Sequence, residues 1–584
     1  MSQLDWIVLV ITLLAIIAYG LSKSRTSRNL DGYFLSNRSL PWGIVLLSIM
    51  STQASAVTFI SAPGQAYTEG MGFVQYYFGI PLATVVICIF FVPIFRKLKV
   101  YTAYEYLEGR FDGKTRTLTA LLFLLQRGLS TGISVFAPSI ILSSLLDWNI
   151  YWTNLFMGGL LIIYTMTGGA KAVAYTQKLQ LIIIFTGMFL AAYMVVKMLP
   201  ENVGFTDALE VSGKLGKLNV ISSGITDGKI DWSGRYNLLS GLIGGFFLVL
   251  SYFGTDQSQV GRYLTAKSDR ESKMGLIMNA FVKVPMQFLI LLVGAMVFTF
   301  YQFNKAPVFF NEKQVEKIQR SPLKDSFNLA NAHYAELAVQ KQTAVTNFTS
   351  ALDTKDEKEI AIRTAELKTL DKQSDSLRAK VKSWISSKEV GGDGNDTNYI
   401  FLRFVLDYLP AGLVGLLIAI IFLASWGSIA AAINSLASAT MIDFHKRFSK
   451  TQQSGEDEYR LSKKYTLIWG VFCIVVAMFT YNIGNSLIEA VNILGSLFYG
   501  VILGVFLVAF FFKNIKNGSA VFWGAVLAEL LVLVVFILTK LETPVLKMGF
   551  LWLNPIGALG VIFFTLLLNP LLKKTGAKER ALNS

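Results

Sequence analysis

Apolar stretches long enough to cross a membrane recur along almost the whole of this 584-residue chain. A helix needs about 20 apolar residues to cross the hydrocarbon core, because each residue adds about 1.5 Å. The composition, 53% hydrophobic and 16% charged, is that of an all-α membrane protein. By length and periodicity we predict about 13 transmembrane helices, near residues 4–21, 43–67, 74–95, 118–145, 152–168, 173–197, 236–255, 274–302, 399–441, 464–482, 485–512, 519–539 and 549–571.

The formal net charge of +15 could indicate nucleic-acid binding, but the placement of the basic residues argues against it. When the spans are counted in turn, the Lys and Arg clusters fall on one side, which is the positive-inside pattern. We therefore predict a multi-pass plasma-membrane protein, of the bacterial inner-membrane kind, with no nucleic-acid partner, its N-terminus outside and its C-terminus cytoplasmic. The clusters lie at 23–28, 96–116, 262–273, 445–450, 513–516 and 573–580.

The cysteines and histidines indicate no enzyme. Cys88 and Cys473 both lie within predicted spans, so they form no disulfide framework. His333 and His445 are the only histidines and lie in or at loops, which leaves no histidine-based metal or nucleophile site. The first span follows MSQLDW, without a basic region before it or a cleavage site after it, and is expected to be a retained helix.

One polar segment divides the membrane region. Residues 304–398 carry 15 basic and 14 acidic residues and separate eight spans in 1–303 from five in 399–584. We expect this insert on the outer face, because long loops translocate largely regardless of charge. Apolar residues near heptad spacing predict a helix over about 360–384, packed as a hairpin against 326–350. The insert is then either a solvated helical hairpin or an element for partner docking or gating.

The most informative segment is Met50 to Gly64, which reads MSTQASAVTFISAPG inside an otherwise apolar stretch. Non-helical backbone at membrane depth persists only where it is buried in protein or lines a cavity. A second interruption is predicted at 236–255, ended by Gly254, Thr255 and Asp256. Paired interruptions in two halves of a chain indicate an inverted-repeat transporter with a site near the midplane.

Both oxygen-rich clusters in the spans suit a sodium ion. Sodium is a hard cation, and freed carbonyls with Ser or Thr hydroxyls are the ligands that a membrane protein can supply for it. Residues 51–55 offer both kinds, and 424–438 forms a second cluster in which Ala424 and Ser428 share one helix face. The alternative is close packing of small residues, with Ser hydroxyls bonded to the preceding turn.

Four motifs, in order and on the matching spans, resemble the sodium:solute symporter family across essentially the whole membrane region. The resemblance implies a LeuT-type fold of two inverted five-helix repeats with flanking helices, working by alternating access. The motifs are SAVTFISAPGQAYTEG at 55–70, YTMTGGAKAVAYTQKLQ at 164–180, GRYLTAKS at 261–268 followed by AFVKVP at 280–285, and AAINSLASATMIDF at 431–444.

The resemblance also implies a sodium site between the interrupted helix and the later small-residue helix. Its ligands are the carbonyls of Ser51, Ala54 and Ala424 and the hydroxyl of Ser428. Two positions depart from the family: Gly427 stands where a second hydroxyl is expected, and Gln177 replaces the aspartate of the Thr-Asp motif. A neighbour such as Ser425 or a water could replace the missing ligand, or the site is weaker. We expect sodium as the co-transported ion, one per cycle.

An arginine inside a span is the first candidate for solute contact. Arg127 lies about nine residues into its span, roughly 13 Å deep and close to the midplane. Its guanidinium could hold a carboxylate in bidentate fashion. It could also neutralise an internal acid such as Glu489 or Glu529, or fill the space of the missing aspartate and its ion.

The remaining candidates come from the resemblance. Lys283 matches a lysine of the sugar-carrying branch, but the other sugar-contact positions fall on Thr58, Tyr77, Val249 and Asn492, which weakens a hexose. FAPSIIL at 136–142 is more similar to the iodide, vitamin and monocarboxylate carriers. The aromatic candidates for walls or gates are Tyr67, Tyr76, Tyr77, Phe78 and Tyr252. Tyr252 suits an inner gate, as does an ion pair between Asp256 and Arg262.

These features together predict a sodium-coupled symporter that imports a small polar or anionic organic solute and works within a lipid bilayer. A sodium/sugar symporter is the alternative within the family. An uncoupled channel or uniporter, and a transporter-derived sensor, are the alternatives from other classes.

Overall fold

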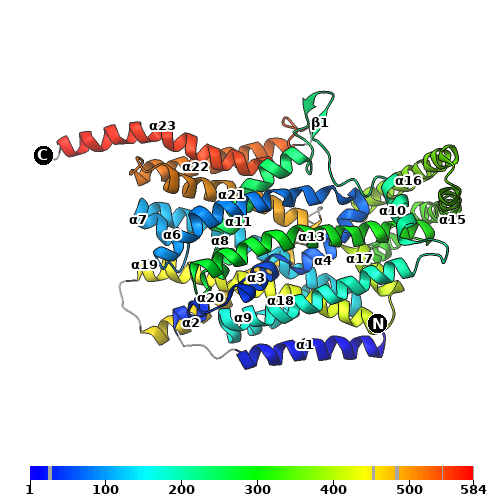
Figure 1. Ribbon diagram of the computed structural model, residues 1–584, viewed down its shortest axis with the longest axis horizontal. Helices are drawn as coiled ribbons and strands as arrows, with labels where there is room; N and C mark the ends of the chain where they lie inside the picture. The colour runs from blue at the N-terminus through cyan, green and yellow to red at the C-terminus, as the bar shows by residue number, and fades with distance from the viewer. Residues whose placement is uncertain (24–28, 450–453, 481–485, 542, 583–584) are drawn as a thin grey trace.

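The computed structural model describes residues 1–23, 29–449, 454–480, 486–541 and 543–582. Most helices run along the long axis of a single bundle (Figure 1). Within the described residues, ten helices are long and apolar enough to cross a membrane, or eleven when a bent pair is included. Shorter apolar helices at Ile150–Met166 and Ser240–Thr255 fall on two further predicted spans. The total of 13 therefore stays a prediction.

The first part of the bundle contains the bent pair. Trp42–Gln53 and Ala56–Glu69 meet at an angle of 59°. The break is narrower than the polar run at 50–64 suggests, because only Ala54 and Ser55 leave the helix and Pro63 lies inside its second half. The helices of this part are α1 Gln3–Lys23, α2 Leu30–Leu35, η1 Ser36–Arg38, α3 Trp42–Gln53, α4 Ala56–Glu69, η2 Met71–Gly79, α5 Ile80–Val86, η3 Ile87–Phe91, α6 Val92–Lys97, α7 Glu105–Arg110 and α8 Gly113–Leu146.

The helix α9, Ile150–Lys197, is strongly bent. The hydroxyls of Tyr164 and Thr176 lie 2.5 Å apart, although 12 residues of straight helix would advance about 18 Å. The two spans predicted at 152–168 and 173–197 therefore lie on either side of a bend. After α9 come α10 Phe205–Lys214, a small hairpin of β1 Ile225–Thr226 and β2 Lys229–Ile230, η4 Ser240–Gly245, α11 Phe246–Thr255, α12 Gln257–Leu264 and α13 Asp269–Phe303.

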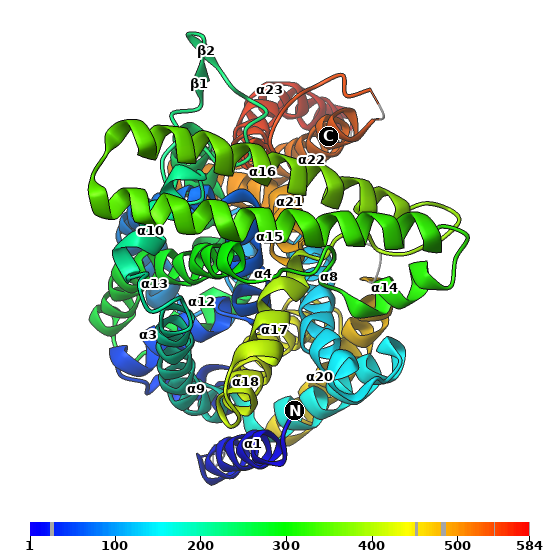
Figure 2. The same cartoon turned by 90° about the vertical axis from the view of Figure 1, so that its right-hand side faces the viewer.

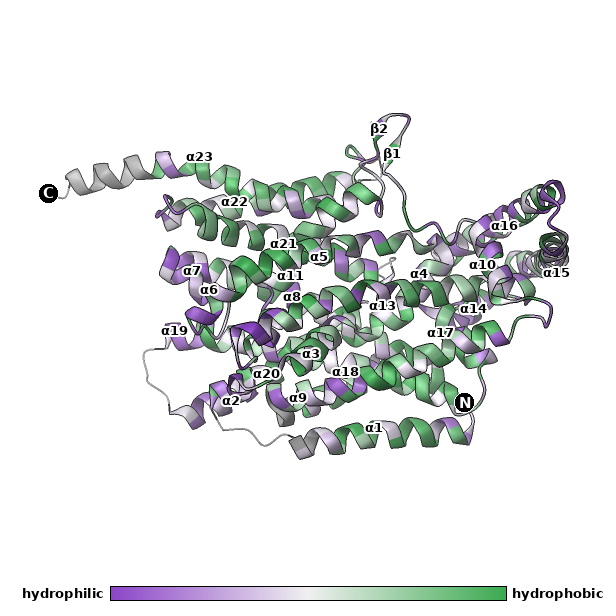
Figure 3. Cartoon of the chain, in the orientation of Figure 1, coloured by the Kyte–Doolittle hydropathy of each residue, from purple (hydrophilic) through white to green (hydrophobic). Residues whose placement is uncertain are grey.

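Residues 304–398 contain α14 Glu312–Gln319, α15 Lys324–Thr354 and α16 Glu357–Ile385. The helices α15 and α16 lie side by side across one end of the bundle (Figure 2). Hydrophilic residues gather there and at the opposite end, while the middle of the bundle is mainly hydrophobic (Figure 3). This distribution is the one expected for a bilayer around the middle.

The long span predicted at 399–441 is wrong as a single helix. It consists of α17, Thr397–Tyr408, and α18, Leu413–Ala439, which are separated at Pro410 to Gly412. Gly412 has a φ of +88°, which favours glycine. The Asp5 carboxylate accepts hydrogen bonds from the amides of Gly412 at 2.6 Å and Gly415 at 3.1 Å, so α1 satisfies the backbone donors of the turn.

The chain ends with helices on two sides of the bundle. The helices α22 and α23 pack against each other at the edge opposite α1 (Figure 1). The elements are η5 Thr440–His445, α19 Lys446–Phe448, α20 Gly455–Phe479, α21 Leu487–Phe511, α22 Gly518–Lys540, η7 Phe550–Trp552 and α23 Leu553–Leu582.

Candidate functional site

The break between α3 and α4 redirects backbone carbonyls at the centre of the bundle. Ala54 and Ser55 have extended or irregular backbone, with ψ of 77° and 174°. The amide of Thr58 donates to the carbonyl of Ser55 at 2.9 Å, so it leaves the carbonyl of Ala54, its usual acceptor in a helix. The break thus provides the freed oxygen that the sodium hypothesis requires.

All four candidate sodium residues are buried, and α18 lies against α3 beside them. A Cβ built on Gly427 would lie 2.8 Å from the Ser51 hydroxyl, so this glycine allows the two helices to approach. The Ser51 hydroxyl has no hydrogen-bond partner among the described residues. The Ser428 hydroxyl donates to the Ala424 carbonyl at 3.0 Å, which leaves its lone pairs available to a cation.

Gln177 of α9 joins the same helices. Its amide nitrogen donates to the Gly427 carbonyl at 2.9 Å, and the Thr52 hydroxyl lies 3.4 Å away. Its amide oxygen accepts from the Ser48 hydroxyl at 2.7 Å. A neutral side chain that donates and accepts therefore stands where the family motif has an acid.

A cavity of about 110 Å³ lies beside the break. It is lined by residues of α4, η2, α5, α8, α11, α13 and α21, together with Gln53 at the end of α3 and Ser55 of the break. Besides Tyr76 and Val249, six of the residues proposed for solute contact or gating line this cavity. These are Thr58, Tyr77, Arg127, Tyr252, Lys283 and Asn492.

Arg127 is balanced by Asp256, which caps the N-terminus of α12. Its Nη1 lies 3.8 Å from Asp256 Oδ2, and its guanidinium carbon lies 5.7 Å from the centre of the Tyr252 ring. The Tyr499 hydroxyl donates to the same carboxylate at 2.6 Å. Arg127 therefore does not pair with Glu489 or Glu529.

The predicted ion pair between Asp256 and Arg262 is wrong. Both residues are buried, but Asp256 pairs with Arg127, and the Nε and Nη1 of Arg262 have no partner within the described chain. Six residues along a helix rotate a side chain by about 240°, so the two side chains leave α12 on different faces.

Lys283 is the second cation at the cavity, and it is 1% exposed. Its Nζ lies 5.4 Å from the centre of the Tyr77 ring, and no ion pair to it is formed among the described residues. The cavity and its immediate wall therefore hold one ion pair and one amine without a carboxylate partner among the described residues.

A smaller cavity of about 70 Å³ continues from the first and shares Gln53, Ser55, Arg127 and Tyr252 with it. Ser428 lines this smaller cavity, together with Ser130 and Ser134 of α8. The larger of these two cavities and the proposed sodium ligand are therefore neighbours. Sequence reasoning missed the α8 hydroxyls, because a serine in a span is more often bonded to its own helix.

Aromatic residues close the cavity on the side of the insert. Tyr76 and Tyr77 line the cavity, and Phe73 contacts both, with ring centres 5.8 Å from each. Tyr236 lies 4.9 Å from Phe73. Of the other aromatic candidates, Tyr67 packs against Phe298 and Phe310 instead.

An ion pair ties the elements around this closure. Arg235 Nη1 lies 2.9 Å from Glu489 of α21 and 3.7 Å from Glu69 at the end of α4. Sequence reasoning missed Arg235, because it lies in a loop and its partners are distant in the chain.

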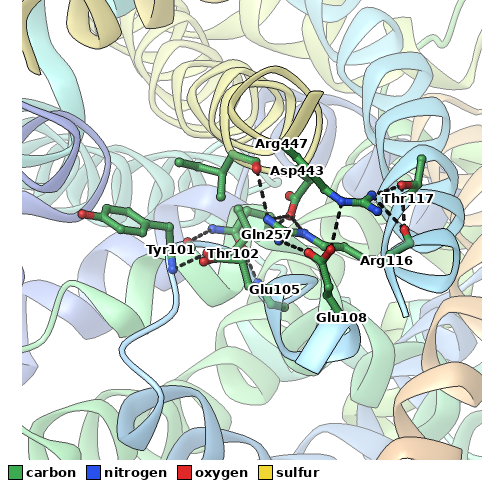
Figure 4. Close-up of polar contacts among 12 residues, drawn as sticks. Tyr101, Thr102, Glu105, Glu108, Arg116, Thr117, Gln257, Asp443 and Arg447 are labelled. Atoms are coloured by element: carbon green, nitrogen blue, oxygen red, sulfur yellow. Dashed lines mark hydrogen bonds and ion pairs between the residues drawn. The ribbon is translucent and has the colours of Figure 1, made fainter. Parts of the chain in front are cut away.

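At the opposite end, a charged network links five segments (Figure 4). Asp443 of η5 accepts from Arg116 of α8 at 2.8 Å and from the Thr102 hydroxyl at 2.9 Å. Glu108 of α7 bridges Arg116 at 2.7 Å and Arg447 of α19 at 3.0 Å. The network therefore connects η5 and α19, which follow α18, to α7, α8 and the loop before α7.

The second interrupted helix joins this end as well. Gln257, the first residue of α12, donates to the Tyr101 carbonyl at 2.7 Å and accepts from the Ala103 amide at 3.1 Å (Figure 4). Tyr101 also donates to Asp31 at 2.9 Å. Burial, with this bond to Asp31, raises the pKa of the Tyr101 hydroxyl to about 12. In the sequence, only the charged residues near the ends of predicted spans indicated that this region could form contacts.

Comparisons with known proteins agree with this architecture. The model of the sodium:solute symporter family matches residues 33–321 and 378–528. The sodium/sialic acid symporter NanT of Aliivibrio fischeri is 25% identical over 577 residues, which cover 98% of this chain and 94% of that protein. The sodium/glucose cotransporter of Vibrio parahaemolyticus is 29% identical over 304 residues, which cover 50% of this chain and 55% of that protein.

A solved structure shares the fold. It is a substrate-bound, outward-open state of a Na⁺-coupled sialic acid symporter, with a TM-score of 0.72 and 22% identity over 98% of both chains. The fold is therefore LeuT-like, as expected, while the division into two inverted repeats stays a prediction. The family match covers most of the chain, so this chain belongs to the sodium:solute symporter family, multi-pass membrane transporters in which sodium is the co-transported ion.

Proposed function

We propose that this protein imports a small organic anion together with one sodium ion by alternating access in a bacterial inner membrane. The observation that carries the proposal is the cavity beside the break. There Arg127 is balanced by Asp256, while Lys283 has no carboxylate partner among the described residues. Burying an unpaired cation is costly, and a solute carboxylate would supply the missing charge.

The sodium ion would bind between the end of α3 and α18. The freed carbonyls of Ser51 and Ala54, the Ala424 carbonyl and the Ser428 hydroxyl are its ligands in this proposal. The unpartnered Ser51 hydroxyl faces Gly427 and offers an oxygen where the family's second hydroxyl is missing. The amide of Gln177 donates to the Gly427 carbonyl, which supports a stoichiometry of one, because a bound donor leaves that oxygen less available to a second ion.

Coupling would follow from α18, which carries both the sodium ligands and the network at the opposite end. Ser428 and Asp443 are 15 residues apart, about 22 Å of continuous helix. Sodium would stabilise the arrangement in which the end near Asp443 is closed and the end near the insert can open. Such coupling requires that the two states differ in sodium affinity. In this orientation the insert and the N-terminus are outside.

The deciding experiment is solute uptake into proteoliposomes with and without an inward sodium gradient. A panel of monocarboxylates, sialic acid, amino acids and hexoses should be screened first by thermal shift, because a ligand that binds only the folded state stabilises it. We expect an anion whose stabilisation and uptake both require sodium. Uptake that ignores the gradient would refute sodium coupling, and selective uptake of a neutral hexose would refute the anion.

The variant Ser428→Ala tests the sodium ligand. If one oxygen ligand of the cation contributes as much free energy as a hydrogen bond to a charged group, its loss should weaken the apparent sodium affinity about tenfold or more. Ser435→Ala is the matched control, because Ser435 is buried on the same helix and donates to the Ala431 carbonyl at 2.8 Å in the same way. Equal sodium affinity in both variants would contradict the assignment.

A further inference from the structure

A larger cavity lies away from the proposed solute cavity. It is a cleft of about 520 Å³ between the second half of α9 and α13, nearly five times the volume of the solute cavity. Every lining residue is apolar, so the cleft offers no side-chain hydrogen bond to an occupant. The lining residues are Phe59, Phe185, Met188, Phe189, Ala192, Val196, Phe205, Phe281, Val282, Pro285, Met286, Leu289, Ile290, Leu292, Val293 and Met296.

The cleft is continuous with the surface that meets the hydrocarbon. Both of its main walls, Ala170–Lys197 and Asp269–Phe303, are membrane-spanning helices. At its rim Phe189 is 62% exposed and Phe281 is 72% exposed, and these rings face lipid rather than water. Water has no polar partner in such a cleft, and a void of this size would lose dispersion contacts along every wall.

The residues at the end of α9 indicate where the cleft lies along the membrane normal. Val196 is the last cleft residue of α9, and the next residue, Lys197, lies with its Nζ 6.0 Å from the centre of the Tyr193 ring. Tyrosine and lysine at a helix end are typical of the membrane interface. A lipid with its head group at this level would place an acyl chain in the cleft.

We infer that an acyl chain of a bilayer phospholipid occupies this cleft and braces the helices that hold the solute cavity. The connection is direct, because α4 and α13 each line both cavities. On α4, Thr58 lines the solute cavity and the adjacent Phe59 lines the cleft. On α13, Lys283 lines the solute cavity and the adjacent Val282 lines the cleft.

The acyl chain would therefore pack against α4 and α13, the two helices that also carry residues proposed for solute contact. Between these walls the backbones are already in close contact, since a Cβ on Gly294 would lie 2.2 Å from the Pro63 carbonyl oxygen. Methionines in the lining, such as Met188 and Met286, can adapt their shape to a flexible chain.

Photolabelling in nanodiscs tests the occupant without sodium or solute, so its outcome is independent of the transport proposal. The probe is phosphatidylcholine with a diazirine midway along one acyl chain, and labelled peptides are mapped by mass spectrometry. We expect labelling concentrated on α9 and α13 residues of the cleft. Even labelling of the cleft and of the lipid-facing side of α22 would overturn the inference.

A filled cleft provides the second measurement. Ala192→Trp places a large side chain in the cleft, and Leu190→Trp, at a residue 40% exposed on the same helix but outside the lining, is the control. In Ala192→Trp the acyl chain should lose the burial of roughly two methylene groups, which should lower cleft labelling about tenfold. Leu190→Trp should be labelled like wild type. Phosphatidylcholine should raise the Tm of delipidated wild type and of Leu190→Trp, but not of Ala192→Trp. Equal responses in both variants would refute a bracing chain.

Discussion

Arg127 and Lys283 are two buried cations at one cavity, but their surroundings assign them different roles. Arg127 is balanced by Asp256 and lies beside the Tyr252 ring, whereas Lys283 faces a tyrosine ring and no carboxylate within the described chain. In the proposed function, Arg127 therefore has mainly a structural role, and Lys283 is the residue that would contact the solute. This difference could not be inferred from the sequence, where each is simply a basic residue within an apolar span.

The variant Lys283→Gln should weaken binding of an anionic solute about tenfold to a hundredfold, because a charge-assisted hydrogen bond is lost. Binding should be measured by thermal shift or isothermal calorimetry at saturating sodium. Lys273→Gln is the control on the same helix, since Lys273 pairs with Asp269 away from the cavity. If both variants bind the solute like wild type, Lys283 does not hold the anion.

The variant Arg127→Gln should instead destabilise the fold, because it leaves the Asp256 carboxylate buried without its cation, a loss of about 3–5 kcal/mol. The double variant Arg127→Gln with Asp256→Asn should recover much of the Tm in detergent. Asn keeps the acceptor that caps α12 through the Ser258 amide at 2.7 Å. A double variant no more stable than Arg127→Gln alone would show that the pair is not the source of the loss.

How much of the site could be predicted differs from residue to residue. The six solute candidates were proposed from their positions in spans and motifs, and all six line one cavity. They could be predicted because the depth of a residue in its span and the order of the spans limit where its side chain can lie. The contact of Asp443 with Arg116 joins residues 327 positions apart and depends on how α18 ends against α8. No local pattern encodes that distance. Asp256 was recognised, but its partner was assigned from sequence proximity.

At the scale of elements, hydropathy predicted where helices lie better than where they stop. The stretch 399–441 was expected as one long span because apolar residues continue through it, yet Pro410 and Gly412 end one helix and begin another. The same reasoning overestimated the break at 50–64, since buried helix tolerates Ser, Thr and Pro63. Turn residues therefore deserve more weight than apolar continuity.

A buried carboxylate just before α17 ties α16 to the segment that follows α13. Asp396 accepts from Arg378 and Lys382 of α16, each at 2.9 Å, and from the Phe310 amide at 3.0 Å. Burial alone would raise the pKa of Asp396, but the two cations hold it below its usual value. Its folded pKa is thus below the unfolded pKa of about 3.9, so its stabilising effect is complete above that value and lost as the pH falls further.

We therefore expect Asp396→Asn to destabilise the insert at neutral pH and to lessen its sensitivity to acid. Hydrogen exchange of α16 at pH 7 and thermal unfolding between pH 3 and 7 would measure both effects. Asp393→Asn is the control with the opposite sign, because burial raises the pKa of Asp393, so its charged form is unfavourable at neutral pH. Similar losses in the two variants would contradict a specific role for Asp396.

On the scale of the molecule, the two ends of the bundle are closed by different means. Aromatic rings and the Arg235 ion pairs lie toward the insert, and the Asp443 network lies at the other end, with the solute cavity between them. In the proposed alternating-access cycle, one end opens while the other stays closed, so sodium binding would have to favour one of the two states. A ligand shifts such an equilibrium only by its difference in affinity for the two states.

Access to the cavity should therefore change side with sodium. A single cysteine at Asn492→Cys, in a background with Cys88→Ala and Cys473→Ala, places a thiol on the cavity wall. With a membrane-impermeant thiol reagent, we expect sodium to speed labelling from the outer face and slow it from the inner face. A tenfold shift corresponds to about 1.4 kcal/mol of differential sodium binding. Ser139→Cys, buried in α8 away from the cavity, should not react. Sodium-independent labelling from both faces would indicate an open channel rather than alternating access.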